Sequence, residues 1–233
     1  EIAAHYHQFV DSPADKLRTE LLYPLLWEIM SPLQGKRVLD IGCGNGFFAH
    51  HLAQRGVQVE AFDNKAMVSI AQEHFDHASI KYIIHDGNVE LPFADETYDC
   101  IVANLVLMDM ENIKTILAET SRLIKPTGQI LFSILHPCFT PPVGKFRRGI
   151  KGRINPALSY FHLSNYFQVA SPTLKQSFGP NIPATNYYHR TLSTYLHLFH
   201  QAGLVMTDMF EPYPDDQFIK KYPQFRHAQK ISI

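Results

Sequence analysis

The sequence predicts an α/β fold, a doubly wound and mostly parallel sheet of seven strands with an antiparallel last strand. Three observations predict it. Short apolar runs alternate with segments of helical periodicity between residues 36 and 135. The first run turns into a glycine-rich loop, KRVLDIGCGNGFFA over 36–49. Acidic residues stand where later runs end, and parallel strands joined by right-handed crossovers would collect those acids on one edge.

The chain divides into a core and two additions. Residues 1–34 read as an N-terminal helical cap, because leucines recur at helical spacing between Leu17 and Met30. Residues 35–135 and 191–233 form the predicted Rossmann-like core, with the sixth strand over Leu204–Phe210 and the antiparallel last strand over Phe225–Ile233. Residues 136–190 are rich in proline and aromatic residues and lack periodicity, which indicates a substrate lid inserted after strand five.

Composition excludes several classes of protein. Of 233 residues, 45% are hydrophobic and 18% are charged, which suits one globular domain and not a disordered tail. The net charge of −1 argues against a dedicated nucleic-acid binder. No apolar run reaches the ~18–20 residues that cross a bilayer, so no membrane association is expected.

Cysteines and histidines bear on location and metals. Three widely separated cysteines, with no C-x-x-C pair, are typical of a reducing compartment, and no secretory pattern opens the sequence. We therefore expect a cytoplasmic protein. Histidine pairs at helical spacing, such as His74 with His77, lack the carboxylate or cysteine that would complete a ligand set, so no metal site is expected.

The glycine loop is the strongest single motif. Gly42, Gly44 and Gly46 follow a G-x-G-x-G spacing, which differs from the G-x-G-x-x-G of dinucleotide binders. Asp40 stands two residues before the first glycine, where a carboxylate would repel a pyrophosphate and suit a ligand with an ammonium group. Taken alone, the same loop could be a structural turn.

Two further acids extend the motif. Asp63 ends the second predicted strand, 17 residues beyond Gly46, where an acid can accept hydrogen bonds from ribose hydroxyls. It could instead cap the helix that follows. Asp86 follows the third predicted strand and is a candidate acceptor for an adenine amino group, although a lone Asp is also common in turns.

Four ordered segments resemble the Rossmann-like class I S-adenosylmethionine-dependent methyltransferases: VLDIGCGNG, EAFDNKAM, IIHDGNVELPFADETYDCIVANLVL and RLIKPTGQILFS. The LPF-x-D block is similar to that of the branch acting on small molecules. FSILHPCF and YYHRTLSTYLHLFHQAGL look like elements of a bacterial subgroup whose substrate the resemblance does not supply.

The resemblance implies S-adenosyl-L-methionine as cofactor, S-adenosyl-L-homocysteine as product, and methyl transfer to O, N or C of a small-molecule acceptor. It implies these cofactor-binding residues: Tyr6, Arg18, Asp40, Gly42, Cys43, Gly44, Gly46, Asp63, Asn64, Met67, Asp86, Gly87, Asn88, Asn104 and Leu105.

Catalysis by such a protein needs alignment and the exclusion of water, and a general base is optional. The candidate bases are His136 after strand five, His189 in the lid, and Asp109, which follows strand four where relatives often carry His. Two alternatives stay open: a cofactor-binding protein without turnover, and an RNA methyltransferase that uses the basic segment Lys145–Arg153. The sequence leaves the oligomeric state open.

Overall fold

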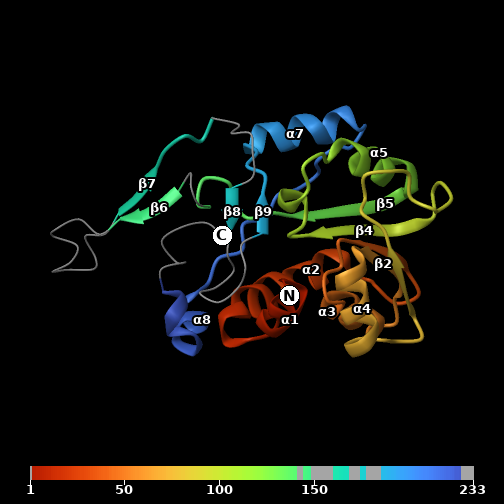
Figure 1. The fold of residues 1–233 in the computed structure, drawn as a ribbon, viewed down its shortest axis with the longest axis horizontal. Coiled ribbons are helices and arrows are strands. Elements are labelled where there is room, and N and C mark those ends of the chain that lie inside the picture. The colour runs from red at the N-terminus through yellow and green to blue at the C-terminus, as the bar shows by residue number, and fades with distance from the viewer. Residues whose placement is uncertain (1, 141–143, 148–159, 168–173, 177–184, 227–233) are drawn as a thin grey trace.

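The protein, seen here as a computed structural model, is described over residues 2–140, 144–147, 160–167, 174–176 and 185–226 (Figure 1). Its centre is a five-stranded sheet of order β3-β2-β1-β4-β5, and every pair in it is parallel. The strands are β1 (Arg37–Ile41), β2 (Gln58–Asp63), β3 (Ile80–Ile84), β4 (Tyr98–Asn104) and β5 (Ile124–Ser133). The prediction of an α/β fold with a mostly parallel sheet is confirmed.

Helices cover both faces of the sheet, as Figure 1 shows. One face carries α2 (Tyr23–Met30), α3 (Phe47–Ala53) and α4 (Lys65–His74), and the other carries α5 (Lys114–Leu123) and α7 (Leu192–Gln201).

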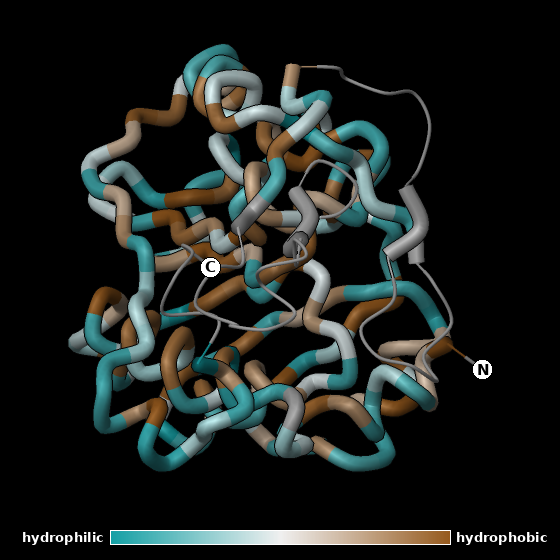
Figure 2. Tube along the Cα trace, turned by 90° about the vertical axis from the view of Figure 1, so that its left-hand side faces the viewer, coloured by the Kyte–Doolittle hydropathy of each residue, from teal (hydrophilic) through white to brown (hydrophobic). Residues whose placement is uncertain are grey.

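Strand alternation divides the core between these layers. Val38 of β1 packs into the cluster beside α2 and α3, while Leu39 and Ile41 pack into the cluster beside α5 and α7. Hydrophobic residues accordingly run along the interior strands, and hydrophilic ones prevail on outer loops (Figure 2).

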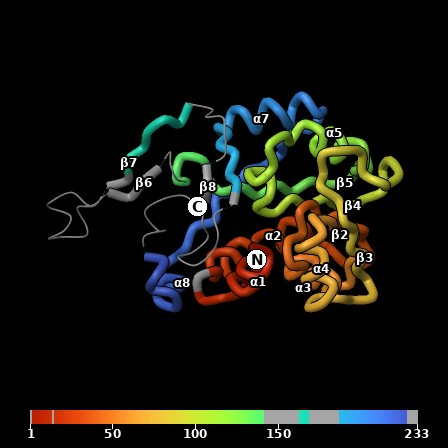
Figure 3. Tube along the Cα trace, viewed as in Figure 1, coloured from red at the N-terminus to blue at the C-terminus, as the bar shows by residue number. Residues whose placement is uncertain are grey.

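The N-terminal cap, residues 2–30, is a chain of short helices (Figure 3). They are α1 (Ile2–Phe9), η1 (Pro13–Asp15), the π-helical η2 (Arg18–Leu22) and α2. Pro24 falls in the first turn of α2, where its missing N–H costs no helical hydrogen bond. α1 packs against α4, so the cap lies beside the carboxyl ends of the strands.

One described element after β5 differs from expectation. Leu204–Phe210, expected as a sixth strand, is irregular, since a strand requires a hydrogen-bonded neighbour and none of the described residues pairs with it. The residues after Leu204 are open to solvent, with Val205 82% exposed. The sheet described therefore has five strands instead of seven, and β5 forms one edge.

The expected antiparallel last strand falls partly outside the described residues. Phe225 ends a 3-10 helix, η5 (Pro223–Phe225), and residues 227–233 are not described. α8 (Asp216–Lys221) precedes η5.

The segment expected as a lid is described in parts. It contains two antiparallel pairs, β6 (Gly144–Arg147) with β7 (Tyr160–Leu163) and β8 (Leu174–Gln176) with β9 (Thr185–Tyr187). Its role as a substrate lid stays a prediction. Within the described ranges, every helix is too short or too polar to span a bilayer.

We predict that Ile101→Ala, in the centre of β4, lowers the free energy of unfolding by about 2–5 kcal/mol, because the side chain is 0% exposed and its removal leaves a cavity. Val89→Ala, at a side chain that is 61% exposed, should change it by less than about 0.5 kcal/mol. Urea unfolding at fixed pH measures both, and equal effects would contradict the described core.

Candidate functional site

The site lies where the strand order reverses, between β1 and β4. The chain passes from β1 outward to β2 and β3, then returns to place β4 on the other side of β1. A crevice forms outside the carboxyl ends of strands at such a point. The glycine loop, residues 42–46, leaves β1 there, and η3 (Leu107–Asp109) follows β4.

The glycine loop is packed closely on both sides. Gly42, Gly44 and Gly46 have φ of 67°, 57° and 85°, in the left-handed region that side chains disfavour. A Cβ at Gly42 would overlap the side chain of Val106, and one at Gly44 would lie 3.0 Å from Cε1 of Tyr6. Glycine is therefore required for the loop to lie between the exit of β4 and the N-terminal cap.

Asp63 joins the glycine loop to the end of β2. Its Oδ2 accepts a hydrogen bond from the Gly44 amide at 2.9 Å, and its Oδ1 accepts from the Asn64 amide at 2.7 Å. Asn64 in turn caps α4, accepting from the amides of Ala66 and Met67. Oδ1 also accepts from the Asn64 side-chain amide at 2.7 Å, so Oδ2 is the oxygen that keeps a second lone pair for a ligand hydroxyl. Burial raises the pKa of Asp63 despite these bonds.

Asp40 is the buried acid behind the loop. It is 1% exposed, and its Oδ2 has no hydrogen-bond partner among the described residues. Burial, and secondly the nearby charge of Asp63, raise the pKa of Asp40 to about 7. An unpaired buried carboxylate costs free energy, and a bound cation would lower that cost.

The exit of β4 is held by β5. Ser133 donates from its hydroxyl to Oδ1 of Asn104 at 2.6 Å and accepts from the Leu105 amide at 3.0 Å. Leu105 has φ 55°, a strained value for a branched side chain. Strain that neighbours hold in place is common at ligand sites.

The end of β3 provides the third side of the site. Asp86 is exposed there, and its Oδ1 accepts from the Asn88 amide at 3.0 Å, which lowers the pKa of Asp86. His85 accepts from the Gly87 amide through Nδ1 at 3.0 Å. Met67 lies on the facing helix α4 and lines the same cavity as Asp86.

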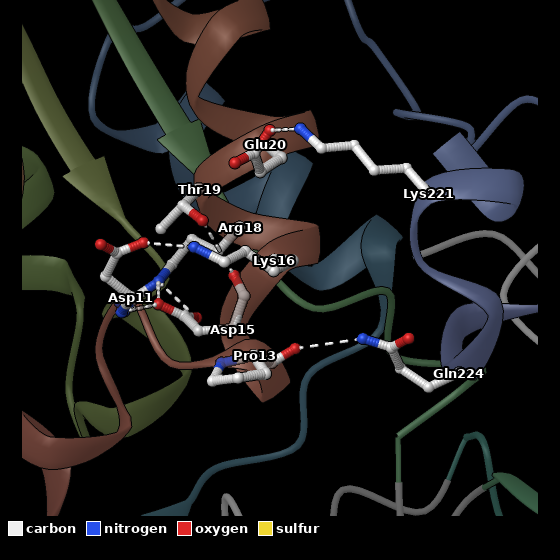
Figure 4. Close-up of polar contacts among 9 residues, drawn as sticks. All are labelled: Asp11, Pro13, Asp15, Lys16, Arg18, Thr19, Glu20, Lys221 and Gln224. Atoms are coloured by element: carbon white, nitrogen blue, oxygen red, sulfur yellow. Dashed lines mark hydrogen bonds and ion pairs between the residues drawn. The ribbon is translucent and has the colours of Figure 1, made fainter. Parts of the chain in front are cut away.

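Tyr6 and Arg18 of the cap form one network. The Arg18 guanidinium donates to the Tyr6 hydroxyl at 2.7 Å and pairs with the buried Asp15 at 2.6 Å. Figure 4 shows Asp15 and Arg18 beside two contacts with the C-terminal region: Lys221 with Glu20 at 3.0 Å, and the Gln224 amide with the Pro13 carbonyl at 3.4 Å. The cap is thereby tied to α8 and η5.

A continuous cavity of about 2020 Å³ joins these elements. One end is the crevice beside the glycine loop, and the other runs along the edge of β5 beside residues 203–212. The predicted cofactor residues on its wall are Tyr6, Arg18, Gly42, Gly44, Asp63, Asn64, Met67, Asp86, Asn104 and Leu105. Cys43 and Asp40 are buried, 7% and 1% exposed, behind the loop.

Asp109 and His136 both reach the cavity wall. Asp109 is accessible from the cavity, and no hydrogen bond to its carboxylate is found among the described residues. Partial burial, and secondly the charge of Asp63, raise the pKa of Asp109 to about 7. His136 accepts from the Cys138 amide through Nδ1 at 3.2 Å, so its Nε2 carries the proton and faces Glu211 at 3.8 Å. Burial lowers the pKa of His136.

His189 is placed differently. It is 3% exposed, and its Nε2 donates to the Tyr166 carbonyl at 2.8 Å. In this arrangement its ring is enclosed by protein. The neighbouring Arg190 donates to the carbonyls of Leu107, Met110 and Glu111, which fixes the segment that carries Asp109.

The sequence reasoning missed Asn45, His7 and Ser133. Asn45 is 3% exposed inside the glycine loop, and its side chain meets Nδ1 of His7 at 3.0 Å. Ser133 ends β5 and orients both residues that leave β4. The position of Asn45 inside G-x-G-x-G was the one available signal. Among the described residues, no group of three or more His, Cys, Asp or Glu side chains has a geometry that could hold a metal ion.

The fit to a cationic nucleoside ligand rests on three features. The glycine loop exposes bare backbone to the cavity, the unpartnered Oδ2 of Asp40 lies behind it, and Asp63 and Asp109 add negative charge nearby. Together with the parallel sheet, they are the features by which a Rossmann-like class I S-adenosylmethionine-dependent methyltransferase, the class that the sequence resembles, would hold its cofactor.

Comparison with known proteins agrees with that class. Residues 39–132 match the family described as "Methyltransferase domain". A methyltransferase of known structure from Mesorhizobium loti, described as S-adenosylmethionine-dependent, superposes with a TM-score of 0.75 at 21% identity, covering 91% of this chain and 93% of that one. This likeness bears on the fold.

Two curated relatives match the central region. The Ubiquinone biosynthesis O-methyltransferase of Photobacterium profundum is 30% identical over 45% of this chain and 46% of its own length. The Malonyl-[acyl-carrier protein] O-methyltransferase of Erwinia billingiae is 37% identical over 44% of this chain and 40% of its own length. The match spans less than half the length of either relative, in the region that contains the glycine loop.

We predict that Asp40→Asn stabilises the ligand-free protein at pH 8. Because the pKa of Asp40 is raised to about 7 on folding, the folded state binds more protons between about pH 4 and 7, and stability falls as pH rises through that window. Removing the charge should raise Tm by several degrees at pH 8 and by little at pH 4. Thermal unfolding across this pH range measures the effect, with Asp86→Asn as an exposed control. Parallel pH profiles for the wild type and Asp40→Asn would contradict it.

Proposed function

We propose that the protein transfers the methyl group of S-adenosylmethionine to O, N or C of a small-molecule acceptor. The observation that carries the proposal is the convergence of Asp40, Asp63 and the glycine loop at the point where the strand order reverses. The sulfonium of the cofactor supplies an activated methyl group, so the chain's own residues need to bind, orient and exclude water.

The proposed binding residues fall into three groups, one each for the ribose, the adenine and the methionine part of the ligand. Asp63 would accept from the ribose hydroxyls, and Asp86 with the Gly87 and Asn88 backbone would meet the adenine. The exposed backbone of the glycine loop and the exit of β4 at Asn104 and Leu105 suit the methionine part. Support comes from the shared cavity wall and from the negative charge beside the loop.

Asp109 is the favoured general base where the acceptor loses a proton. Its carboxylate reaches the cavity without a competing hydrogen bond from the described residues, and its pKa of about 7 suits proton uptake near neutral pH. His136 presents an N–H instead, because its Nδ1 already accepts from the Cys138 amide. We propose that His136 donates to the acceptor and that His189 acts by supporting the segment 185–190.

Small-molecule acceptors are favoured over RNA. The two relatives are named for ubiquinone biosynthesis and for a malonyl-[acyl-carrier protein] substrate, and neither name refers to RNA. Of the basic segment Lys145–Arg153, residues 148–153 lie outside the described residues. Binding of the cofactor without turnover, as in a regulatory subunit, is separated from catalysis by the experiments below.

We predict that the protein binds S-adenosylmethionine and S-adenosylhomocysteine, and that Asp63→Ala weakens both by about 100-fold or more, since two hydrogen bonds to a charged group are lost, one from the ligand ribose and one from the Gly44 amide that holds the loop. Isothermal titration calorimetry at pH 7.5 measures the affinities. Asp76→Ala, which removes an exposed acid just beyond α4, is the matched control for charge. Failure of the wild type to bind either compound would overturn the proposed function.

We predict that Asp109→Asn retains S-adenosylhomocysteine binding and lowers kcat by about 10²–10⁴-fold, as expected for loss of a general base. The assay measures S-adenosylhomocysteine formed with a panel of phenol, carboxylic acid and amine acceptors. The wild-type rate should rise with pH through about 7, and the variant should lose this rise. Unchanged rates would remove Asp109 from catalysis, and no turnover by wild type on any acceptor would favour the regulatory reading.

A further inference from the structure

His7 lies at a junction of three elements and is not among the proposed cofactor-binding residues. It belongs to α1, next to Tyr6, which lies against Gly44. Its ring stacks on that of His74 at the end of α4, with centroids 4.3 Å apart and planes inclined by 18°. Its Nδ1 meets Nδ2 of Asn45, in the glycine loop, at 3.0 Å.

The Asn45 contact fixes the protonation state of His7. Oδ1 of Asn45 accepts from the Phe47 amide at 3.4 Å, so the amide orientation is set and Nδ2 is the group that faces His7. Nδ2 can only donate a hydrogen bond, and therefore Nδ1 of His7 must be a bare acceptor. The structure thus requires a neutral His7 with its proton on Nε2.

Adding a proton to Nδ1 would break this arrangement. The new N–H would face the N–H of Asn45, which is 3% exposed and has little access to water as a substitute partner. The imidazolium would also lie against the ring of His74. Burial, and secondly the charge of His74, lower the pKa of His7, while Glu73 opposes that shift.

The carboxylate that acts on His7 is that of Glu73, near the end of α4. From α4 it faces His74, whose Nε2 lies 4.0 Å from the carboxylate of Glu73, and the edge of Phe75 at 6.1 Å. From the glycine loop, just before α3, it faces the neutral Asn45 amide. His50 and His51 of α3 contact Phe75 and Phe47 instead, at 5.6 and 4.5 Å between ring centroids.

We propose that His7 is a positioning residue for the cofactor loop: as a neutral imidazole it accepts from Asn45 and holds α1, with Tyr6, over Gly44, and its protonation releases this cover. The proposal rests on the proposed binding of S-adenosylmethionine. Cofactor affinity should then fall in mild acid because His7 is protonated. This loss adds to any loss caused by protonation of Asp40 and Asp63.

The test compares His7→Gln with the wild type. The Gln side chain can still accept from Asn45 and does not titrate. When a group must be neutral for binding, affinity falls by up to about tenfold for each pH unit below its pKa. We expect the wild type to lose about tenfold more S-adenosylhomocysteine affinity than His7→Gln between pH 7.5 and pH 5.5, measured by calorimetry. His74→Gln, which keeps His7 and removes its stacked neighbour, should retain part of the acid loss.

A measurement on the wild type covers the case in which His7→Gln folds poorly. Nuclear magnetic resonance of the His7 ring should show a bare Nδ1 at pH 7.5, and saturation with S-adenosylhomocysteine should lower the His7 pKa. Equal acid loss in wild type and His7→Gln, or an unchanged His7 pKa on saturation, would overturn the inference while leaving the proposed function intact. Absence of S-adenosylhomocysteine binding at every pH would overturn the proposed function itself.

Discussion

The hydrogen bond from the Gly44 amide to Asp63, 2.9 Å long, is the contact on which the site depends. It joins the loop after β1 to the end of β2. It requires glycine at position 44, because a Cβ there would lie 3.0 Å from Cε1 of Tyr6. The sheet supplies the register: Ile41 of β1 lies opposite Phe62 of β2, so the two strands end together. Once this pair is fixed, the N-terminal cap, the exit of β4 and α4 all pack around the loop.

Negative charge is concentrated around this contact. Asp40 and Asp109 each interact with Asp63, and both have a pKa raised to about 7. Repulsion among three nearby acids with little compensating charge destabilises the ligand-free protein. Such unfavourable charge clusters are typical of functional sites, where a bound ligand offsets the repulsion. Arg18 does not compensate them, because its guanidinium is paired with Asp15. The site is therefore arranged for a cation, and a pyrophosphate would meet repulsion.

The sequence predicted the strands and helices whose formation depends on local residue pattern. The alternation of apolar runs and helical segments between residues 36 and 135 predicted a parallel sheet with helices between its strands, and five such strands are described. The cap of α4 is Asn64 and not Asp63, which the sequence offered as an alternative. Leu204–Phe210 is apolar enough for a strand, but a strand needs a neighbour, and apolar pattern does not report whether one pairs with it. Asn45 and His7 were missed for a similar reason, because their contact joins positions 38 residues apart through tertiary packing.

The same limit applies to the choice of base, which hydrogen bonds decide and residue type does not. Histidine is the most frequent general base, and His136 was a candidate from the sequence for that reason. The structure gives its Nδ1 a backbone donor at Cys138 and leaves an N–H toward the cavity side. Asp109 has the opposite arrangement: the segment that carries it is held by Arg190 through backbone carbonyls, and its carboxylate remains available. Rigid support with an unoccupied acceptor is the combination that proton removal requires.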